Sequence, residues 1–152
     1  MYSVIRIRGL KHVRPENKTA LESLNLDRKN HCVVVPTKGY EEVLKKVQDY
    51  TAYGTIKVET LAKLIQKRGR LMGDKPISAE FLKEHKFSTH ADLAKAVLEG
   101  KASMKTLGIK PVFRLNSPKK GYGPIGMKKP VQLKGPLGFH PEGLDALVEQ
   151  MM

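Results

Sequence analysis

The sequence predicts an α+β protein, with a β-α-β-α-β core in residues 1–57 and a helical, loop-rich C-terminal extension in residues 58–152. Three observations lead to this class: strand-period segments and amphipathic helical segments alternate in the first third, short capped helices follow, and a basic Gly/Pro-rich stretch occupies much of the last third. Hydrophobic residues make up 40% of the 152 residues, which is enough to form a core.

The first predicted element is a strand over residues 3–8. Polar and apolar residues alternate there, with Ile5 and Ile7 on one face, which is the period of a half-buried strand. The same alternation predicts that Arg6 and Arg8 share the exposed face. The chain therefore begins with a strand that presents two arginines.

The rest of the core follows from similar patterns. Apolar residues at helical spacing predict helices over residues 16–26 and 40–50. The β-branched run HCVVV, closed by Pro36, predicts a buried strand over residues 31–35, with its cysteine in the core. A third strand is expected over residues 55–58. Two helices would then cover one face of the sheet and leave the other face open.

Helix signals dominate the first half of the extension. Ser78 and Thr89 stand at positions typical of helix N-caps, the second with Asp92 in a capping-box spacing. Residues 117–138 contain five Gly, four Pro and five Lys without any period, which predicts a long basic loop. The expected elements are helices over residues 59–67, 78–84 and 89–99, a strand over 111–116, this loop, and a closing helix that starts near Pro141.

The charge distribution predicts a polyanionic partner. The formal net charge is +13, and no Asp or Glu occurs between Lys101 and His140, whereas nine Lys or Arg residues do. Solvated surfaces usually intersperse both signs, so a long segment of one sign favours neutralisation by nucleic acid. Scarce aromatic residues, 6% of the chain, favour phosphate contacts to structured RNA over stacking on single-stranded bases.

Several function classes find no support in the sequence. No apolar run approaches the length of a membrane span, and Cys32 is the only cysteine, so an internal disulfide is excluded and a reducing cytoplasm is expected. The five histidines lack metal-site spacing, and no nucleophile motif or carboxylate pair is present. We therefore expect no catalytic residue, no metal and no cofactor.

One motif could indicate a nucleotide site. GYGPIG, Gly121–Gly126, has the spacing G-x-G-x-x-G, but prolines follow it where a dinucleotide site needs a helix. A backbone that lies against phosphates is the favoured interpretation.

Two other functions find less support in the sequence. A DNA-binding helix-turn-helix regulator could use the helices of residues 59–100, whose low net charge of +2 and lack of a basic recognition helix count against it. An RNA-modifying enzyme would need an acid, a base or a cofactor pocket.

Several segments of the chain resemble the large-subunit ribosomal protein thirty family. The resemblance is to the long archaeal form of this family, which is related to eukaryotic ribosomal protein L-seven. The similarity lies in IRIRGL, in TALESLNLDRKNHCVVVPT, in YTAYGTIKVETLAKLIQKRGR, in FRLNSPKKGYGPIGMKKP and in the terminal LVEQMM. It covers nearly the whole chain, and the order and spacing of these segments together are specific.

The resemblance implies a three-stranded antiparallel sheet with two helices, related to the ferredoxin-like arrangement, plus a C-terminal subdomain. It also implies a structural role as a monomer in the cytoplasmic ribosome, with contacts to large-subunit ribosomal RNA, to 5S ribosomal RNA and to neighbouring ribosomal proteins. Carried over by position, the candidate RNA-binding residues are Arg6, Arg8, Lys11, Arg14, Arg28, Lys29, Asn30, Lys67, Arg68, Arg70, Arg114, Lys119, Lys120, Lys128 and Lys129.

Overall fold

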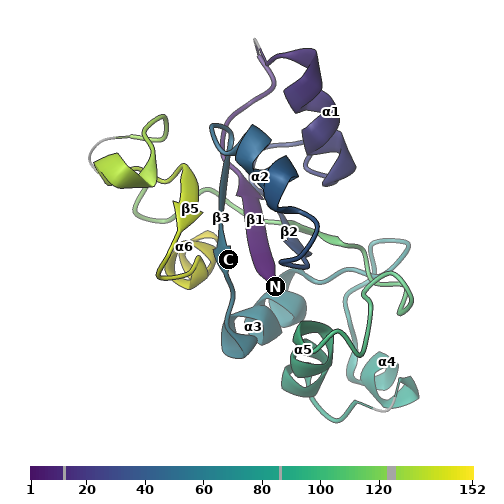
Figure 1. The fold of residues 1–152 in the computed structure, drawn as a ribbon. Coiled ribbons are helices and arrows are strands. Elements are labelled where there is room, and N and C mark those ends of the chain that lie inside the picture. The colour runs from purple at the N-terminus through teal and green to yellow at the C-terminus, as the bar shows by residue number, and fades with distance from the viewer. Residues whose placement is uncertain (12, 86, 123–125) are drawn as a thin grey trace.

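The computed structural model describes residues 1–11, 13–85, 87–122 and 126–152. Within these ranges the strands form a five-stranded sheet in the order β4-β2-β1-β3-β5. Helices lie on both sides of this sheet (Figure 1). The predicted α+β class is confirmed.

The three central strands form the expected antiparallel sheet. β1 (Tyr2–Arg6) lies between β2 (His31–Val35) and β3 (Thr51–Thr55) and is antiparallel to both. β2 has the predicted bounds, but the prediction of β3 over residues 55–58 is wrong. The first four residues of β3 are all buried, so the alternation that would have revealed the strand is missing from its sequence.

Helices α1 (Pro15–Ser23) and α2 (Glu41–Val47) cover one face of the sheet, and their apolar residues pack on Val4, Val33 and Tyr53. The opposite face is not open, contrary to expectation. Ile5, Ile7 and Cys32 are fully buried there with residues of the C-terminal segment. α3 (Val58–Arg68), α5 (His90–Leu98) and α6 (Asp145–Met151) supply much of this second core.

The C-terminal segment also supplies both edges of the sheet. β4 (Val112–Arg114) pairs antiparallel with β2, and β5 (Gly138–His140) pairs parallel with β3. At Gly54 an added Cβ would lie 2.8 Å from the carbonyl oxygen of His140. Glycine is therefore required there, because any side chain would push β5 away from β3.

The helix starts were predicted more accurately than the basic loop. The Ser78 hydroxyl caps α4 (Ala79–Glu84) by accepting from the Phe81 amide at 3.3 Å, and Thr89 and Asp92 form the expected capping box of α5. The stretch predicted as a loop over residues 117–138 contains a short 3-10 helix, η1 (Val131–Leu133), and the first residue of β5. α6 begins four residues later than the predicted start at Pro141.

Candidate nucleic-acid interface

Four cations surround one hollow at the end of the sheet where β1 finishes. Arg8 and Lys11 follow β1, Lys29 precedes β2, and Lys128 belongs to the basic loop. The hollow has a volume of about 350 Å³, and Gly9, Tyr50 and Met127 complete its lining. We call these four cations the sheet-end cluster.

Local contacts position Arg8 within this cluster. Its guanidinium donates to the carbonyl oxygen of Asp49 at 3.1 Å and lies 5.1 Å from the centroid of the Tyr50 ring. A cation over an aromatic ring is attracted by the quadrupole of the ring, by about 0.5–1 kcal/mol at an exposed site. Neither contact neutralises the charge. Arg8 is therefore oriented in advance and still able to bind an anion.

Gly9 leaves the space that the Lys29 side chain uses. A Cβ at position 9 would lie 3.1 Å from Cε of Lys29, closer than an ordinary van der Waals contact. The absence of a side chain at Gly9 thus lets Lys29 lie against the backbone that follows β1.

Asn30 joins the basic loop to the sheet. Its backbone has a positive φ of 63°, a conformation that asparagine tolerates better than most residues. Its side-chain amide donates to the Ser117 hydroxyl at 3.4 Å, and its side-chain carbonyl accepts from the Tyr122 hydroxyl at 3.2 Å. Asn30 therefore uses its polar groups to hold the start of the loop beside the sheet-end cluster.

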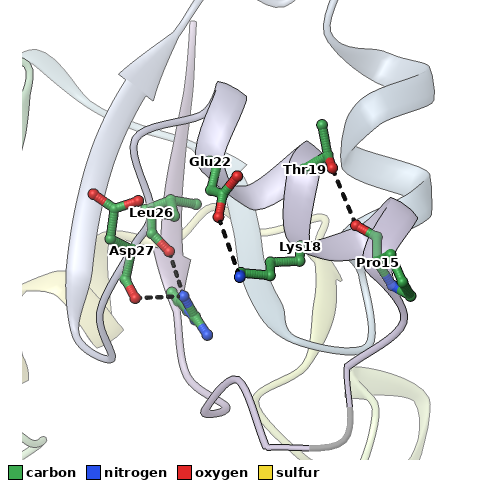
Figure 2. Close-up of polar contacts among 7 residues, drawn as sticks. Pro15, Lys18, Thr19, Glu22, Leu26 and Asp27 are labelled. Atoms are coloured by element: carbon green, nitrogen blue, oxygen red, sulfur yellow. Dashed lines mark hydrogen bonds and ion pairs between the residues drawn. The ribbon is translucent and has the colours of Figure 1, made fainter.

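The prediction that Arg6 lies on an exposed face is wrong, because its side chain is only 1% exposed. Its Nη1 donates to the carbonyl oxygens of Leu26 at 2.6 Å and Asp27 at 2.8 Å, and its Nε donates to the Arg8 carbonyl at 2.9 Å. Figure 2 labels the two acceptor residues, Leu26 and Asp27. Burial lowers the pKa of Arg6, an effect that the charge of Asp27 opposes. Arg6 ties β1 to the connection between α1 and β2, and it is not part of the interface.

A second group of cations lies near β4. Arg68, Arg70, Lys110 and Arg114 line a hollow of about 240 Å³ together with Asp74 and Val112. We call these four cations the β4-edge cluster.

An internal carboxylate, that of Asp74, pairs with two of the four cations of the β4-edge cluster. Lys110 pairs with Asp74 at 2.6 Å, and Arg114 lies 3.8 Å from the other oxygen of the same carboxylate. The hydrogen bond from Lys110, then its charge and that of Arg114, lower the pKa of Asp74. Arg68 donates to the carbonyl oxygen of Met152 at 2.8 Å.

His31 lies opposite Arg114 in the pairing of β2 with β4. Burial, and next the positive charge of Arg114, lower its pKa from the ordinary 6.5. The imidazole is therefore neutral at pH 7 and adds no cation to either cluster.

The sequence of this chain is similar to those of known proteins. Residues 2–51 match the family described as Ribosomal protein L30p/L7e. The large ribosomal subunit protein uL30 of Archaeoglobus fulgidus is 44% identical over 154 residues and that of Methanococcus maripaludis strain S2 43% over 152 residues, each alignment covering 99% of both chains. The Nanoarchaeum equitans uL30 protein is 41% identical over 149 residues, with 97% of this chain and 96% of the relative aligned. The chain belongs to the L30p/L7e family of ribosomal proteins.

In this member of the family, the structure gathers some predicted residues and leaves others apart. Arg8, Lys11, Lys29 and Lys128 meet in the sheet-end cluster, and Arg68, Arg70 and Arg114 meet in the β4-edge cluster. The remaining predicted cations are exposed but line neither hollow: Arg14, Arg28, Lys67, Lys119, Lys120 and Lys129. Lys110 was missed as a site residue, although it belongs to the long one-sign segment that the sequence makes visible.

Three further features of the described part of this L30p/L7e member concern metal sites, membrane-spanning helices and a dinucleotide site. Across the described residues, no group of three potential ligands could hold a metal ion, and no helix is long and apolar enough to cross a membrane. In the GYGPIG motif, residues 123–125 lie outside the described ranges. Gly121 and Gly126 both have a positive φ, and the next helical element is the three-residue η1. Such a short element is a poor match for a dinucleotide site, which needs a full helix.

Proposed function

We propose that this chain is a structural protein of the large ribosomal subunit, in the cytoplasmic ribosome, that binds ribosomal RNA mainly through the sheet-end cluster. The relatives are proteins of the large ribosomal subunit, and the L30p/L7e family is one of ribosomal proteins rather than of enzymes. This membership also weighs against a helix-turn-helix regulator. The finer proposal concerns which residues meet the RNA.

The observation that carries this proposal is the convergence of unpaired cations. Arg8, Lys11, Lys29 and Lys128 come from separate parts of the chain, and none is paired with a carboxylate among the described residues. Lysine and arginine side chains that surround a shallow hollow suit a phosphate backbone, because each phosphate accepts hydrogen bonds from several donors. The cluster therefore favours recognition of RNA shape and charge over base sequence.

The β4-edge cluster and the exposed loop lysines would extend the contact. Arg114 is exposed and lies 3.8 Å from an oxygen of Asp74, a longer pair than the 2.6 Å pair of Lys110, so its guanidinium can also reach a phosphate. Lys119 and Lys120 are exposed, and the backbone of Lys119 donates to the Gln150 carbonyl at 3.2 Å. We expect that Lys119→Glu combined with Lys120→Glu weakens RNA binding while the thermal unfolding midpoint is unchanged. An unchanged affinity would remove this part of the loop from the interface.

The decisive test measures binding to large-subunit ribosomal RNA as salt is varied. If six phosphates are neutralised, log K should fall with log salt at a slope of about −4 to −5. The protein should also cosediment with large subunits at moderate salt and be released at high salt. A flat salt response would contradict the electrostatic mechanism, and stronger binding to competing duplex DNA would restore the regulator hypothesis.

Contact with 5S ribosomal RNA and with neighbouring ribosomal proteins is a further part of the proposal. Separate titrations with 5S RNA and with large-subunit RNA fragments distinguish the two RNA partners. Protection of 5S RNA from chemical probing by the bound protein would support this contact. Equal protection in the absence of the protein would count against it.

A further inference from the structure

A second hollow adjoins the sheet-end cluster. Its volume is about 490 Å³, within the range of roughly 300–1,000 Å³ of small-molecule sites. The turn between α2 and β3 contributes Gln48 and Asp49, and β5 contributes Phe139. Pro130, Val131 and Gln132 of the basic loop and Pro141 after β5 form other parts of the wall.

Three aromatic side chains from three strands pack together beside this hollow, and one of them, Phe139, lines it. The ring centroid of Phe139 lies 5.6 Å from that of Tyr53 and 6.1 Å from that of Tyr2. Tyr53 is only 8% exposed, whereas Phe139 is 44% exposed and is among the few large apolar side chains on the described surface. The two tyrosines therefore support a phenylalanine ring that stays partly open to the hollow.

The same two cations line both hollows. Arg8 and Lys128 belong to the sheet-end cluster and also to the wall around Phe139. A phosphate held by either cation would place the attached nucleotide at the mouth of the second hollow. The amides of Gln48 and Gln132 can donate and accept, and the Asp49 carboxylate can accept, which matches the mixed pattern of a base edge.

We propose that this second hollow binds one unpaired nucleotide of the RNA, with its base stacked on Phe139 and its phosphate on Arg8 or Lys128. This inference rests on the proposed function, because it adds a base contact to the phosphate contacts. It also modifies the expectation that stacking is unimportant in this chain. The packing of Phe139 on Tyr2 and Tyr53 is not predicted from the sequence, because the predicted bounds of β3 are wrong and no strand is predicted at β5.

The first test compares substitutions at position 139 in binding to large-subunit RNA. Base stacking on an aromatic side chain is worth enough that Phe139→Ala should weaken binding about 5- to 150-fold. The slope of log K against log salt should not change, since no cation is lost. Phe139→Tyr should bind like the unmodified protein, whereas Phe139→Leu, which keeps an apolar side chain, should be weakened like Phe139→Ala.

Leu133→Ala provides a matched control, because Leu133 is also an exposed apolar residue of this segment but does not line the hollow. It should leave the affinity unchanged. If Phe139→Leu binds as tightly as the unmodified protein, the contact is apolar packing and the stacking proposal is overturned. If Phe139→Ala also binds normally, the hollow takes no base. If the unmodified protein shows no salt-dependent binding to large-subunit RNA, the proposed function itself is contradicted.

The second test identifies the nucleotide directly. A photoreactive benzoylphenylalanine replaces Phe139 in one sample and Leu133 in another, and each protein is irradiated in complex with large-subunit RNA. A crosslink from position 139 should map to one nucleotide that is unpaired in the RNA secondary structure. Crosslinks spread over base-paired nucleotides, or the same pattern from position 133, would overturn the proposal.

Discussion

The sheet-end cluster and the β4-edge cluster each contain four cations, but the protein uses these charges differently. In the β4-edge cluster, Lys110 and Arg114 share the carboxylate of Asp74. Arg8 in the sheet-end cluster contacts a carbonyl and an aromatic ring, which orient its charge without cancelling it. From this comparison we expect RNA binding to depend more on the number of cations without an internal anionic partner than on the total number of cations in a patch.

The strongest test of this difference reverses two charges in the sheet-end cluster. Lys29→Glu with Lys128→Glu should weaken RNA binding about 100-fold at physiological salt and reduce the magnitude of the salt slope by about 2, because two phosphate contacts are replaced by repulsion. Filter-binding titrations at several salt concentrations measure both. Lys38→Glu with Lys95→Glu makes the same charge change at exposed positions elsewhere and should have a much smaller effect. Equal losses in the two double variants would show that only net charge matters.

Arg6 is a cation whose side chain is buried and contacts only groups of the protein itself, so it should contribute to stability and not to RNA binding. Arg6→Ala should lower the free energy of unfolding by about 3 kcal/mol, because buried carbonyl groups of Leu26 and Asp27 lose a charged donor. Urea unfolding measures this change. Arg28→Ala, an exposed arginine close in sequence, should change stability by no more than about 0.5 kcal/mol. If the two variants were equally stable, the structural role of Arg6 would be wrong.

A smaller effect is expected at the β4-edge cluster. Asp74→Asn removes the carboxylate that Lys110 and Arg114 share, so RNA affinity should rise about threefold if RNA approaches this edge. The same titrations measure it, with Glu41→Gln on the exposed surface of α2 as the control for loss of one negative charge. An unchanged affinity for Asp74→Asn would limit the interface to the end of the sheet.

The smallest expected effect is at the buried thiol of Cys32, on β2, which should not react in the folded protein. Burial raises the pKa of Cys32 to about 12, so at pH 9 only about one thiol in a thousand is ionised. The folded protein should therefore resist alkylation from pH 7 to pH 9, and the protein unfolded in urea should react quickly. Rapid labelling of a folded variant would reveal a disrupted sheet, which makes this assay a check on every substitution above.

Local sequence signals were informative where an element has a distinctive composition or a clear cap. The β-branched run HCVVV predicted the bounds of β2, and Ser78 and Thr89 predicted the starts of α4 and α5. These signals failed for β3, where burial removes the alternation and β-branched residues are fewer, and for β5, which has three residues at the end of a Gly/Pro-rich stretch. Short strands that pair with distant segments carry little local signal.

The candidate site shows the same limit. Clusters of basic residues identified most of the cations that meet in the two hollows. Alternation placed Arg6 on the surface, because a local pattern contains no information on whether a later segment covers it. Phe139 was missed for a related reason, since its aromatic neighbours belong to strands far away in the sequence.

The position of β4 and β5 has a consequence for synthesis on the ribosome. A nascent chain that has reached residue 111 can already pair β1, β2 and β3, but the outer edges of β2 and β3 then lack their partners. Unpaired strand edges are templates for aggregation. We expect translation products that stop before β4 to self-associate, and synthesis of residues 112–152 to be the step that protects the sheet edges during the maturation of this protein.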